Sequence, residues 1–503
     1  MTTATTSSTG GTGGTGGTGG GQSTGGGQST AGGKSTGRTA EERTIRLDSA
    51  RAGTGPATWG QRAIWGVVTR LGDDAPRYNL RLDLPLAPPR PAARVLADLT
   101  ELLRMHDSLR TRLLPNGVDG VDGADGVDGL EQVVDGSGEL PVEVRECSEA
   151  DAPAVGASLM EELAGRSFDH AREWPFRVGL VECGGLVHRL VLAASHTAMD
   201  LWGEGRMLRD LALIEEGESA EALLRARPAL QPLEAAEIQA SPLGRRRDEG
   251  ARRYWCERLT AGPKRIFLNP ADPERAATDP GRMFPNALLH SPALAVAVER
   301  VAEKLGVSDA AVLLGAASHQ LARMSGSSDV LFQVVVSNRF QPAAAESVST
   351  MAQEAVFLLT DADKDFEDAV RRTRSVSFSA FRHAGYDKWA LEREVARLVE
   401  RGEAADHSCW WNDTRDPADG PFDTAPRPGA PLGELAGRTV FSWPTEFLPR
   451  VNVSVAVDVL TAPGALELCM TADPAVLSRE GMERFLRGVE ESVIAEATAL
   501  GDE

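Results

Sequence analysis

Cysteine is scarce in this 503-residue sequence: there are five, scattered along the chain, and no two of them form a Cys-x-x-Cys pair. Structural zinc sites and disulfide-rich domains both depend on cysteines at short, regular spacings. The sequence therefore predicts neither a zinc site nor a framework of disulfide bonds.

Basic residues are few relative to acidic ones. The chain has 53 Lys and Arg residues against 73 Asp and Glu residues, which gives a formal net charge of −20 at pH 7. A nucleic-acid-binding protein presents a basic surface to the phosphates. This charge balance argues against nucleic acid as the main partner.

Long apolar runs are missing as well. No stretch of 18 apolar residues occurs, and the N-terminus has no apolar core of the kind that a signal peptide needs. We therefore expect a cytoplasmic protein that does not interact with a membrane. The hydrophobic fraction of 42% is ordinary for a globular protein, and a chain of this length can bury one large core or two moderate ones.

Two segments are of low complexity. Residues 1–42 consist mainly of Gly, Thr and Ser, a composition from which no core can be built, so we expect a disordered tail. Residues 118–129 repeat Val-Asp-Gly, and because Asp-Gly is typical of tight turns, this segment is interpreted as an expanded hairpin tip. Its spaced carboxylates lack the Glu-terminated twelve-residue pattern of a calcium-binding EF-hand.

The stretch with the clearest chemistry lies at 186–214. Residues 186–194 form a dense apolar run typical of a buried strand, and apolar residues recur at helical spacing from 207 to 214. The turn between them carries His196 and, four residues later, Asp200. Imidazole is the usual general base near neutral pH, and a carboxylate can orient a base or hold a loop. Since a lone histidine after a strand is more often structural, the surrounding motifs have to decide between the two roles.

Further motifs occur in a fixed order around this turn. They are Gln61 in a predicted first helix, Tyr78-Asn79 before a predicted strand, His106 to Arg112, Ser167-Phe168-Asp169, Tyr254-Trp255, and Asn338-Arg339 at the end of a predicted buried strand.

In this order the motifs resemble the condensation-domain superfamily, which includes the condensation domains of nonribosomal peptide synthetases and the chloramphenicol acetyltransferases. The turn resembles the superfamily motif His-His-x-x-x-Asp-Gly, with His196 as the second His. Ser195 stands in place of the first His, and Leu201 stands in place of the Gly. The resemblance covers about residues 45–499, which is one condensation unit.

The resemblance implies a mixed α/β (α+β) fold. We expect two chloramphenicol-acetyltransferase-like lobes in a V-shaped pseudo-dimer, with the active site in the tunnel between them. The N-terminal lobe, which carries the His-x-x-x-Asp motif, is expected at 43–260, and the C-terminal lobe at 261–503.

The resemblance also implies the site. His196 is expected to be catalytic, as a base or by positioning the acceptor, and Asp200 is expected to support the turn by pairing with Arg339. Arginine suits this pairing because it is always charged and can bind a carboxylate through two N–H groups. Possible residues of the substrate tunnel are Ser195, Trp202, Gly203, Asn338 and Trp411. Trp411 belongs to an isolated aromatic and polar cluster at 410–413, and Trp443-Pro444 is expected in a loop.

The implied function is that of a free-standing condensation enzyme in natural-product biosynthesis. It takes an acyl, aminoacyl or peptidyl group from the phosphopantetheine thioester of a carrier protein in trans and transfers it to an amine or alcohol, which forms an amide or an ester. No bound cofactor and no metal are implied, and we expect a monomer.

Two alternatives stay open. A CoA-dependent acyltransferase needs a nucleotide-binding surface, which the sequence does not display clearly. A catalytically degenerate member that serves as a binding module is compatible with the departures at Ser195 and Leu201. The joint presence of His196, Asp200 and Arg339 argues against this second alternative.

Overall fold

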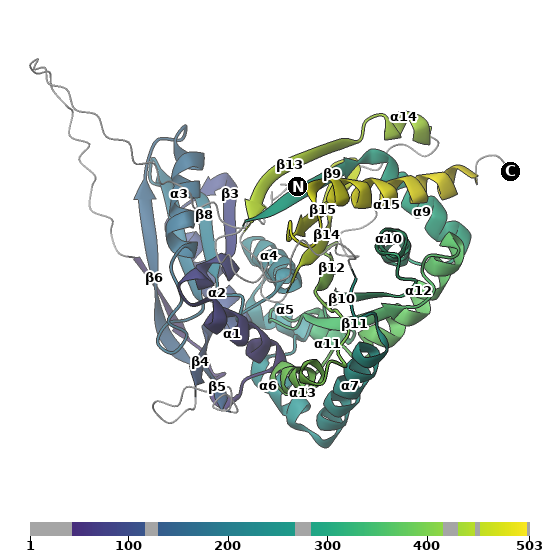
Figure 1. Cartoon of the computed structure of the whole chain (residues 1–503). Helices are drawn as coiled ribbons and strands as arrows, with labels where there is room; N and C mark the ends of the chain where they lie inside the picture. The colour runs from purple at the N-terminus through teal and green to yellow at the C-terminus, as the bar shows by residue number, and fades with distance from the viewer. Residues whose placement is uncertain (1–42, 116–128, 267–282, 416–430, 448–452, 500–503) are drawn as a thin grey trace, which may run out of the picture.

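The computed structural model describes residues 43–115, 129–266, 283–415, 431–447 and 453–499. The tail predicted at 1–42 and nearly all of the Val-Asp-Gly segment lie outside these described residues. Figure 1 shows two halves, each with its own sheet and helices, and helix α4 lies where the two halves meet.

The N-terminal half is built on a five-stranded sheet with the strand order β1-β6-β7-β8-β3. Its strands are β1 (Arg43–Asp48), β3 (Leu80–Arg90), β6 (Ser137–Glu146), β7 (Phe176–Cys183) and β8 (Leu186–Ala194). Strand β8 lies antiparallel between β3 and β7, and Ala194 is opposite both Leu80 and Phe176. The turn after Ala194 therefore starts where three neighbouring strands end or begin.

Helices cover both faces of this sheet. They are α2 (Ala92–Met105), α3 (Ala152–Ala164), α4 (Leu201–Glu215) and α5 (Ala220–Ala226). Val191 and Ala193 pack with α3, whereas Leu190 and Leu192 pack in the cluster that holds α2 and α4. Because β8 is buried on both faces, its sequence is continuously apolar towards its end instead of alternating with polar residues.

A smaller sheet with the order β2-β5-β4 lies beside helix α1. This region comprises β2 (Gly53–Pro56), α1 (Trp59–Leu71), the 3-10 segments Gly72–Tyr78 and Asp107–Arg110, β4 (Thr111–Pro115) and β5 (Leu130–Val134). The Gln61 side chain accepts a hydrogen bond from the backbone N–H of Thr58, while the Thr58 hydroxyl accepts one from the backbone N–H of Gln61. The motif residue Gln61 thus completes a capping box that starts α1.

The C-terminal half is built on a seven-stranded sheet with the order β11-β10-β12-β14-β15-β9-β13. Its strands are β9 (Phe284–Ser291), β10 (Val330–Val336), β11 (Gln353–Leu359), β12 (Cys409–Asp413), β13 (Val440–Phe447), β14 (Val455–Ala462) and β15 (Ala465–Ala472). The β10–β12 and β12–β14 pairs are parallel, and the other pairs in this sheet are antiparallel.

Helices cover this sheet on both faces too. They are α7 (Pro242–Ala261), α9 (Pro292–Leu305), α10 (Asp309–Ser325), α12 (Phe366–Phe381), α13 (Lys388–Glu400) and α15 (Arg479–Ala499). Of the shorter helices, α6 (Pro232–Ala240) contacts β2 and α7, α14 (Leu432–Ala436) contacts α9, and α11 (Pro342–Ala345) lies in the segment after β10. Phe332 of β10 packs in the large cluster with α9, α10 and α15, whereas its neighbour Leu331 packs with α7 and α13. Helix α7 therefore packs with the residues after 260, although the predicted boundary at 260 assigns nearly all of it to the N-terminal lobe.

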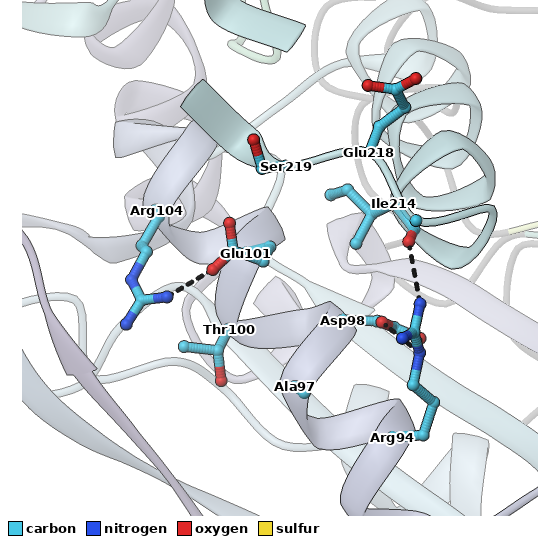
Figure 2. Close-up of a pocket in the computed structure, with 10 residues that line it drawn as sticks. Arg94, Ala97, Asp98, Thr100, Glu101, Arg104, Ile214, Glu218 and Ser219 are labelled. Carbon is cyan, nitrogen blue, oxygen red and sulfur yellow. Dashed lines mark hydrogen bonds and ion pairs between the residues drawn. The ribbon is translucent and has the colours of Figure 1, made fainter. Parts of the chain in front are cut away.

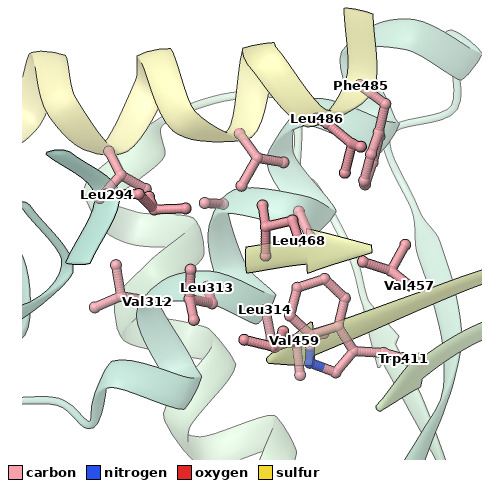
Figure 3. Close-up of a cluster of buried hydrophobic side chains, with 14 of the residues drawn as sticks. Leu294, Val312, Leu313, Leu314, Trp411, Val457, Val459, Leu468, Phe485 and Leu486 are labelled. Atoms are coloured by element: carbon pink, nitrogen blue, oxygen red, sulfur yellow. The ribbon is translucent and has the colours of Figure 1, made fainter. Parts of the chain in front are cut away.

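Two aromatic segments differ from the sequence-based expectation. The cluster at 410–413 is not isolated but forms most of β12, inside the large sheet. Trp411 is 2% exposed and its ring centroid lies 6.0 Å from that of Phe332, so it is a core residue (Figure 3). Trp443-Pro444 lies in strand β13 and not in a loop. Proline is tolerated there because β13 is an edge strand and its register with β9 shifts between Ser442 and Thr445.

Candidate active site

A tight turn connects β8 to α4 and carries the histidine. The backbone N–H of Ala198 donates to the carbonyl of Ser195 at 2.9 Å, which closes the turn around His196 and Thr197. Asp200 is the N-cap of α4, because its side chain accepts from the backbone N–H of Gly203 at 2.9 Å. Both ends of the turn are thus fixed by local hydrogen bonds.

His196 is half-buried. Its Nδ1 is fully enclosed and makes no hydrogen bond to another residue, which leaves Nε2 as the ring nitrogen that can meet a substrate. Burial lowers the pKa of His196 from its ordinary value of 6.5, and it outweighs the negative charge of Asp200, which acts to raise this pKa. The imidazole is therefore neutral at pH 7 and able to accept a proton.

Asp200 is 1% exposed, and its carboxylate is saturated with donors. Both of its oxygens face the terminal nitrogens of Arg339, with N–O distances of 2.9 Å in each case. The backbone N–H groups of Met351 and Ala352 also donate to Oδ2, each at 2.8 Å. Burial acts to raise the pKa of Asp200, but Arg339 and the N–H groups of Met351 and Gly203 outweigh burial and hold the pKa below its usual value.

Apart from Gly203, the partners of the Asp200 carboxylate belong to segment 337–352, which follows β10 and reaches into the N-terminal half. Val348 packs in the N-terminal core cluster. The hydroxyl of Ser108 donates to the carbonyl of Val348, and Glu346 accepts from Arg209 at 2.6 Å. The ion pair predicted between Asp200 and Arg339 therefore exists in the structure, and it joins the two halves of the molecule.

Gly203 of α4 lies close to the backbone of this segment. A Cβ atom at residue 203 would lie 3.1 Å from the carbonyl oxygen of Ser349 and 3.0 Å from the Cβ of Met199. Leu201, which replaces the motif glycine, is 37% exposed and begins the helix. The close contact thus falls at Gly203, and the side chain at position 201 is tolerated because it is turned towards the exterior.

Ser195 is 2% exposed and its hydroxyl is fully engaged. Its Oγ lies 2.8 Å from Nε2 of His170 and 2.9 Å from the hydroxyl oxygen of Thr197, and it accepts from the backbone N–H of Thr197 at 3.2 Å. Burial lowers the pKa of His170 to about 4, against Glu173 and Asp169, which act to raise it. His170 is therefore neutral at pH 7, and Ser195 faces His170 and Thr197 instead of open space.

The remaining predicted tunnel residues have different surroundings. Trp202 is half-buried on the first turn of α4, next to the histidine turn. Asn338 has a positive φ of 57°, and its side-chain amide donates to the carbonyls of Met351 and Ala384. Its amide thus fixes the start of segment 337–352. Trp411 lies in the C-terminal core and not beside His196, so we leave it out of the proposed site.

Three residues near the turn were not predicted as site residues. The Tyr78 ring centroid lies 6.1 Å from that of His196, and the β3–β8 pairing next to Tyr78-Asn79 could have indicated this. His170 reaches the turn from a loop 25 residues earlier, which no local pattern predicts. Glu204 is 5% exposed on α4, and burial raises its pKa to about 7. Its position four residues after Asp200 was a visible signal for proximity to the turn.

A hollow of about 440 Å³ lies between α2 and the segment that joins α4 to α5 (Figure 2), away from His196. Both arginines that line it already pair with carboxylates, Arg104 with Glu101 and Arg94 with Asp98. Within the described ranges no cluster of three or more His, Cys, Asp or Glu residues could hold a metal ion. In the same ranges no helix combines the length and apolar character needed to cross a membrane.

Among curated proteins, the chain is similar to sections of much longer synthases. The chain is 26% identical over 365 residues to the isonitrile lipopeptide synthase of Mycobacterium tuberculosis (strain ATCC 25618 / H37Rv), which covers 68% of the chain and 14% of that protein. It is 25% identical over 404 residues to the phosphinothricin tripeptide synthetase PhsB of Streptomyces viridochromogenes, which covers 76% of the chain and 32% of that protein. The chain thus spans less than a third of either relative.

Solved condensation domains share the fold. The condensation domain from the Monacolin K polyketide synthase MokA superposes with a TM-score of 0.63 at 15% identity, over 89% of this chain and 98% of that one. The condensation domain that mediates chain release from the enacyloxin polyketide synthase superposes with a TM-score of 0.64 at 19% identity, over 89% of this chain and 83% of that one. These matches confirm the predicted mixed α/β fold over most of the chain.

The family model is the most direct evidence. Residues 52–403, which are more than half of the chain, match the model described as Condensation domain. This range contains the histidine turn, the Asp200–Arg339 pair and the segment that joins the two halves. The chain therefore belongs to the condensation-domain family.

Proposed function

We propose that this condensation domain transfers an acyl, aminoacyl or peptidyl group from the phosphopantetheine thioester of a carrier protein to an amine or alcohol, with His196 as the general base. One observation carries the proposal. His196 is a neutral, partly exposed imidazole on a turn that is fixed from both halves of the molecule.

The reaction follows from the chemistry of a thioester. Nitrogen or oxygen of the acceptor attacks the thioester carbonyl, a C–N or C–O bond forms, and the C–S bond breaks. His196 Nε2 takes the proton that the acceptor loses, and the proton then passes to the departing thiolate. General-base assistance of this kind contributes about 10²–10⁴-fold to the rate.

Asp200 has a supporting role in this proposal. Its oxygens are occupied by Arg339 and by backbone N–H groups, and its pKa is held below the usual value, so it stays ionised and is not free to exchange a proton with a substrate. Its contribution is to hold the turn in one geometry. Alignment of reacting groups is itself a large part of catalysis, because a misplacement of 1 Å costs about 10²-fold in rate.

The identity of the donor separates this proposal from the nearest alternative. The starter condensation domain of rhizomide synthetase RzmA, an 18% identical structural neighbour, was crystallised as a mutant in complex with C8-CoA and Leu-SNAC. An acyl-CoA is therefore a sensible second donor to test here. The amine or alcohol acceptor, the amide or ester product, a monomeric state and a cytoplasmic location all belong to the proposal.

The test supplies both kinds of donor. Acyl-loaded carrier proteins encoded near this protein are incubated, as separate proteins, with the full chain and with candidate amines and alcohols, and intact-protein mass spectrometry follows the acyl group. Acyl loss from the carrier with a matching amide or ester product supports the proposal.

Two other results would favour one of the alternative functions instead. Transfer from acyl-CoA without transfer from any carrier means that the protein is a CoA-dependent acyltransferase. Absence of transfer from both donors, together with binding of a carrier protein, means that the domain is a binding module.

A further inference from the structure

We propose that His170 is a positioning residue for His196, and that it acts through the hydroxyl of Ser195 to fix the turn that presents the catalytic imidazole. The catalytic consequence rests on the proposed function, whereas the contact between His170 and Ser195 is observed in the structure. It concerns a residue outside the His-x-x-x-Asp motif, 25 residues earlier in the chain.

The contact is short and enclosed. His170 Nε2 lies 2.8 Å from Ser195 Oγ, and the two residues are 9% and 2% exposed. A hydroxyl has one proton to donate and two lone pairs, so Ser195 can bond His170 and Thr197 at the same time in either tautomer of the imidazole. Water does not compete strongly for these groups, because both are buried.

His170 is held independently of the turn. Its backbone carbonyl accepts from the N–H of Leu113 on β4 at 2.8 Å. The edge of its ring meets the ring of Trp65 on α1, with centroids 5.5 Å apart and planes at 76°. Arg177 donates to the carbonyls of Leu163, Arg166 and Ser167 and thus fixes the start of the loop. The imidazole therefore projects from a scaffold that does not include residues 195–200.

Ser195 transmits this position to His196 on both sides. Its N–H donates to the carbonyl of Pro175 at 3.0 Å, and its carbonyl accepts from Ala198 at 2.9 Å. Its Oγ accepts from the N–H of Thr197, the residue directly after His196. The two residues that follow His196, Thr197 and Ala198, thus both donate their backbone N–H groups to Ser195. Of the contacts that Ser195 Oγ makes, those with Thr197 lie within the turn and the one with His170 comes from outside it. Loss of His170 therefore releases the Ser195 hydroxyl from the rest of the N-terminal half.

The family motif and the surroundings of Ser195 both place an imidazole at or beside this position. The family motif carries an imidazole at position 195, where this chain has serine, and the structure brings the imidazole of His170 to the serine hydroxyl. A serine and a histidine in contact could also form a nucleophile and its base. Ser195 is 2% exposed, however, and its hydroxyl is shared with Thr197, so the pair is placed for positioning and not for attack.

The experiment combines removal, conservative replacement and transfer of the imidazole. His170→Ala, Ser195→Ala, the double variant, His170→Gln and the transfer variant Ser195→His/His170→Ala are assayed on the full chain with a donor and acceptor established for the wild type. His188→Ala is the matched control, because His188 lies on β8, the strand that leads to the turn, and its Nε2 faces Glu149 at 3.9 Å.

The inference predicts a specific pattern. His170→Ala and Ser195→Ala each lower kcat by about 10- to 100-fold with little change in the donor KM, because a small misplacement of a catalytic group has this effect. The double variant is no slower than the slower single variant, since both remove one contact. His170→Gln and the transfer variant recover part of the loss, and His188→Ala keeps wild-type kcat.

A second readout does not depend on turnover. The imidazole of His196 is titrated by ¹⁵N NMR in the wild type, in His170→Ala and in the control. A changed titration midpoint in His170→Ala alone supports positioning even if no donor is found, in which case only the proposed function fails. An unchanged midpoint with unchanged kcat, or additive losses in the double variant, overturns the role of His170.

Discussion

Asp200 and Arg339 lie 139 positions apart in the sequence, yet the two oxygens of one meet the two terminal nitrogens of the other at 2.9 Å. Their side chains are 2% and 4% exposed, so the pair is sealed from water. Because Asp200 caps the helix after the histidine turn and Arg339 follows a strand of the other half, this one contact couples the fold of each half to the site between them.

Removal of either Asp200 or Arg339 is expected to leave the other charge buried without its partner. Asp200→Ala or Arg339→Ala is predicted to lower the free energy of unfolding by about 3–5 kcal/mol, as measured by urea denaturation. The double variant loses less than the sum of the two single variants. The exposed pair Arg46–Glu139 is the control, since breaking it changes stability by about 0–1 kcal/mol. Equal losses at both pairs would contradict the buried character of the Asp200 pair.

Gly203 offers a test of the close approach between the halves. Gly203→Ala places a Cβ 3.1 Å from a backbone oxygen of Ser349 and is predicted to cost about 1–3 kcal/mol of stability through overpacking. Gly205→Ala on the same helix meets nothing within 4 Å and is predicted to gain about 0.5–1 kcal/mol from reduced backbone freedom. Thermal unfolding of the two variants measures the difference, and equal shifts would rule out a steric limit at residue 203.

Glu204 is predicted to make the fold sensitive to alkaline conditions. Burial raises its pKa to about 7, above the value of 4.5 for an exposed glutamate, so the folded state favours the protonated acid. The corresponding stability is present below pH 4.5 and is lost as the pH rises through 7. The free energy of unfolding of Glu204→Gln relative to the wild type is therefore expected to increase by about 2–3 kcal/mol between pH 5 and pH 8. Urea denaturation at both pH values measures this, with exposed Glu216→Gln as the control.

His170 is predicted to make the fold sensitive to acidic conditions instead. Burial lowers its pKa to about 4, below the ordinary 6.5, so the folded state disfavours the charged ring. Its contribution to stability is present above pH 6.5 and is lost as the pH falls towards 4. His170→Gln removes this dependence, so the stability difference between variant and wild type should change by about 2 kcal/mol between pH 7 and pH 5 in favour of the variant. A pH-independent difference for His170→Gln would disprove the assignment.

Local sequence patterns predicted the elements that carry the site. The apolar run 186–194 forms β8 with these bounds, and the residues with helical spacing after it lie in α4. These elements are readable because their burial is decided by neighbouring residues in the sequence. The family resemblance added Arg339, whose pairing with Asp200 no local pattern could have indicated.

Tertiary contacts explain what the sequence did not predict. His170 meets Ser195 only because a loop fixed by Arg177 returns to the end of β8. The aromatic and polar cluster at 410–413 suggests Trp411 as a tunnel residue, but in a strand neighbouring residues face opposite sides, and Trp411 faces the core. The predicted loop at Trp443-Pro444 is instead part of β13, because an edge strand accommodates a proline, which has no backbone N–H to donate.

The central claim is that His196 is the catalytic base, and His196→Ala tests it most directly. The measurement is the single-turnover rate of acyl transfer from a loaded carrier protein, followed by intact-protein mass spectrometry, with circular dichroism to verify the fold. The control is His290→Ala, a partly exposed histidine of the C-terminal half. The account predicts that His196→Ala slows transfer by about 10²–10⁴-fold while the variant stays folded and the control keeps its rate. A folded His196→Ala protein that transfers the acyl group at the wild-type rate would contradict it.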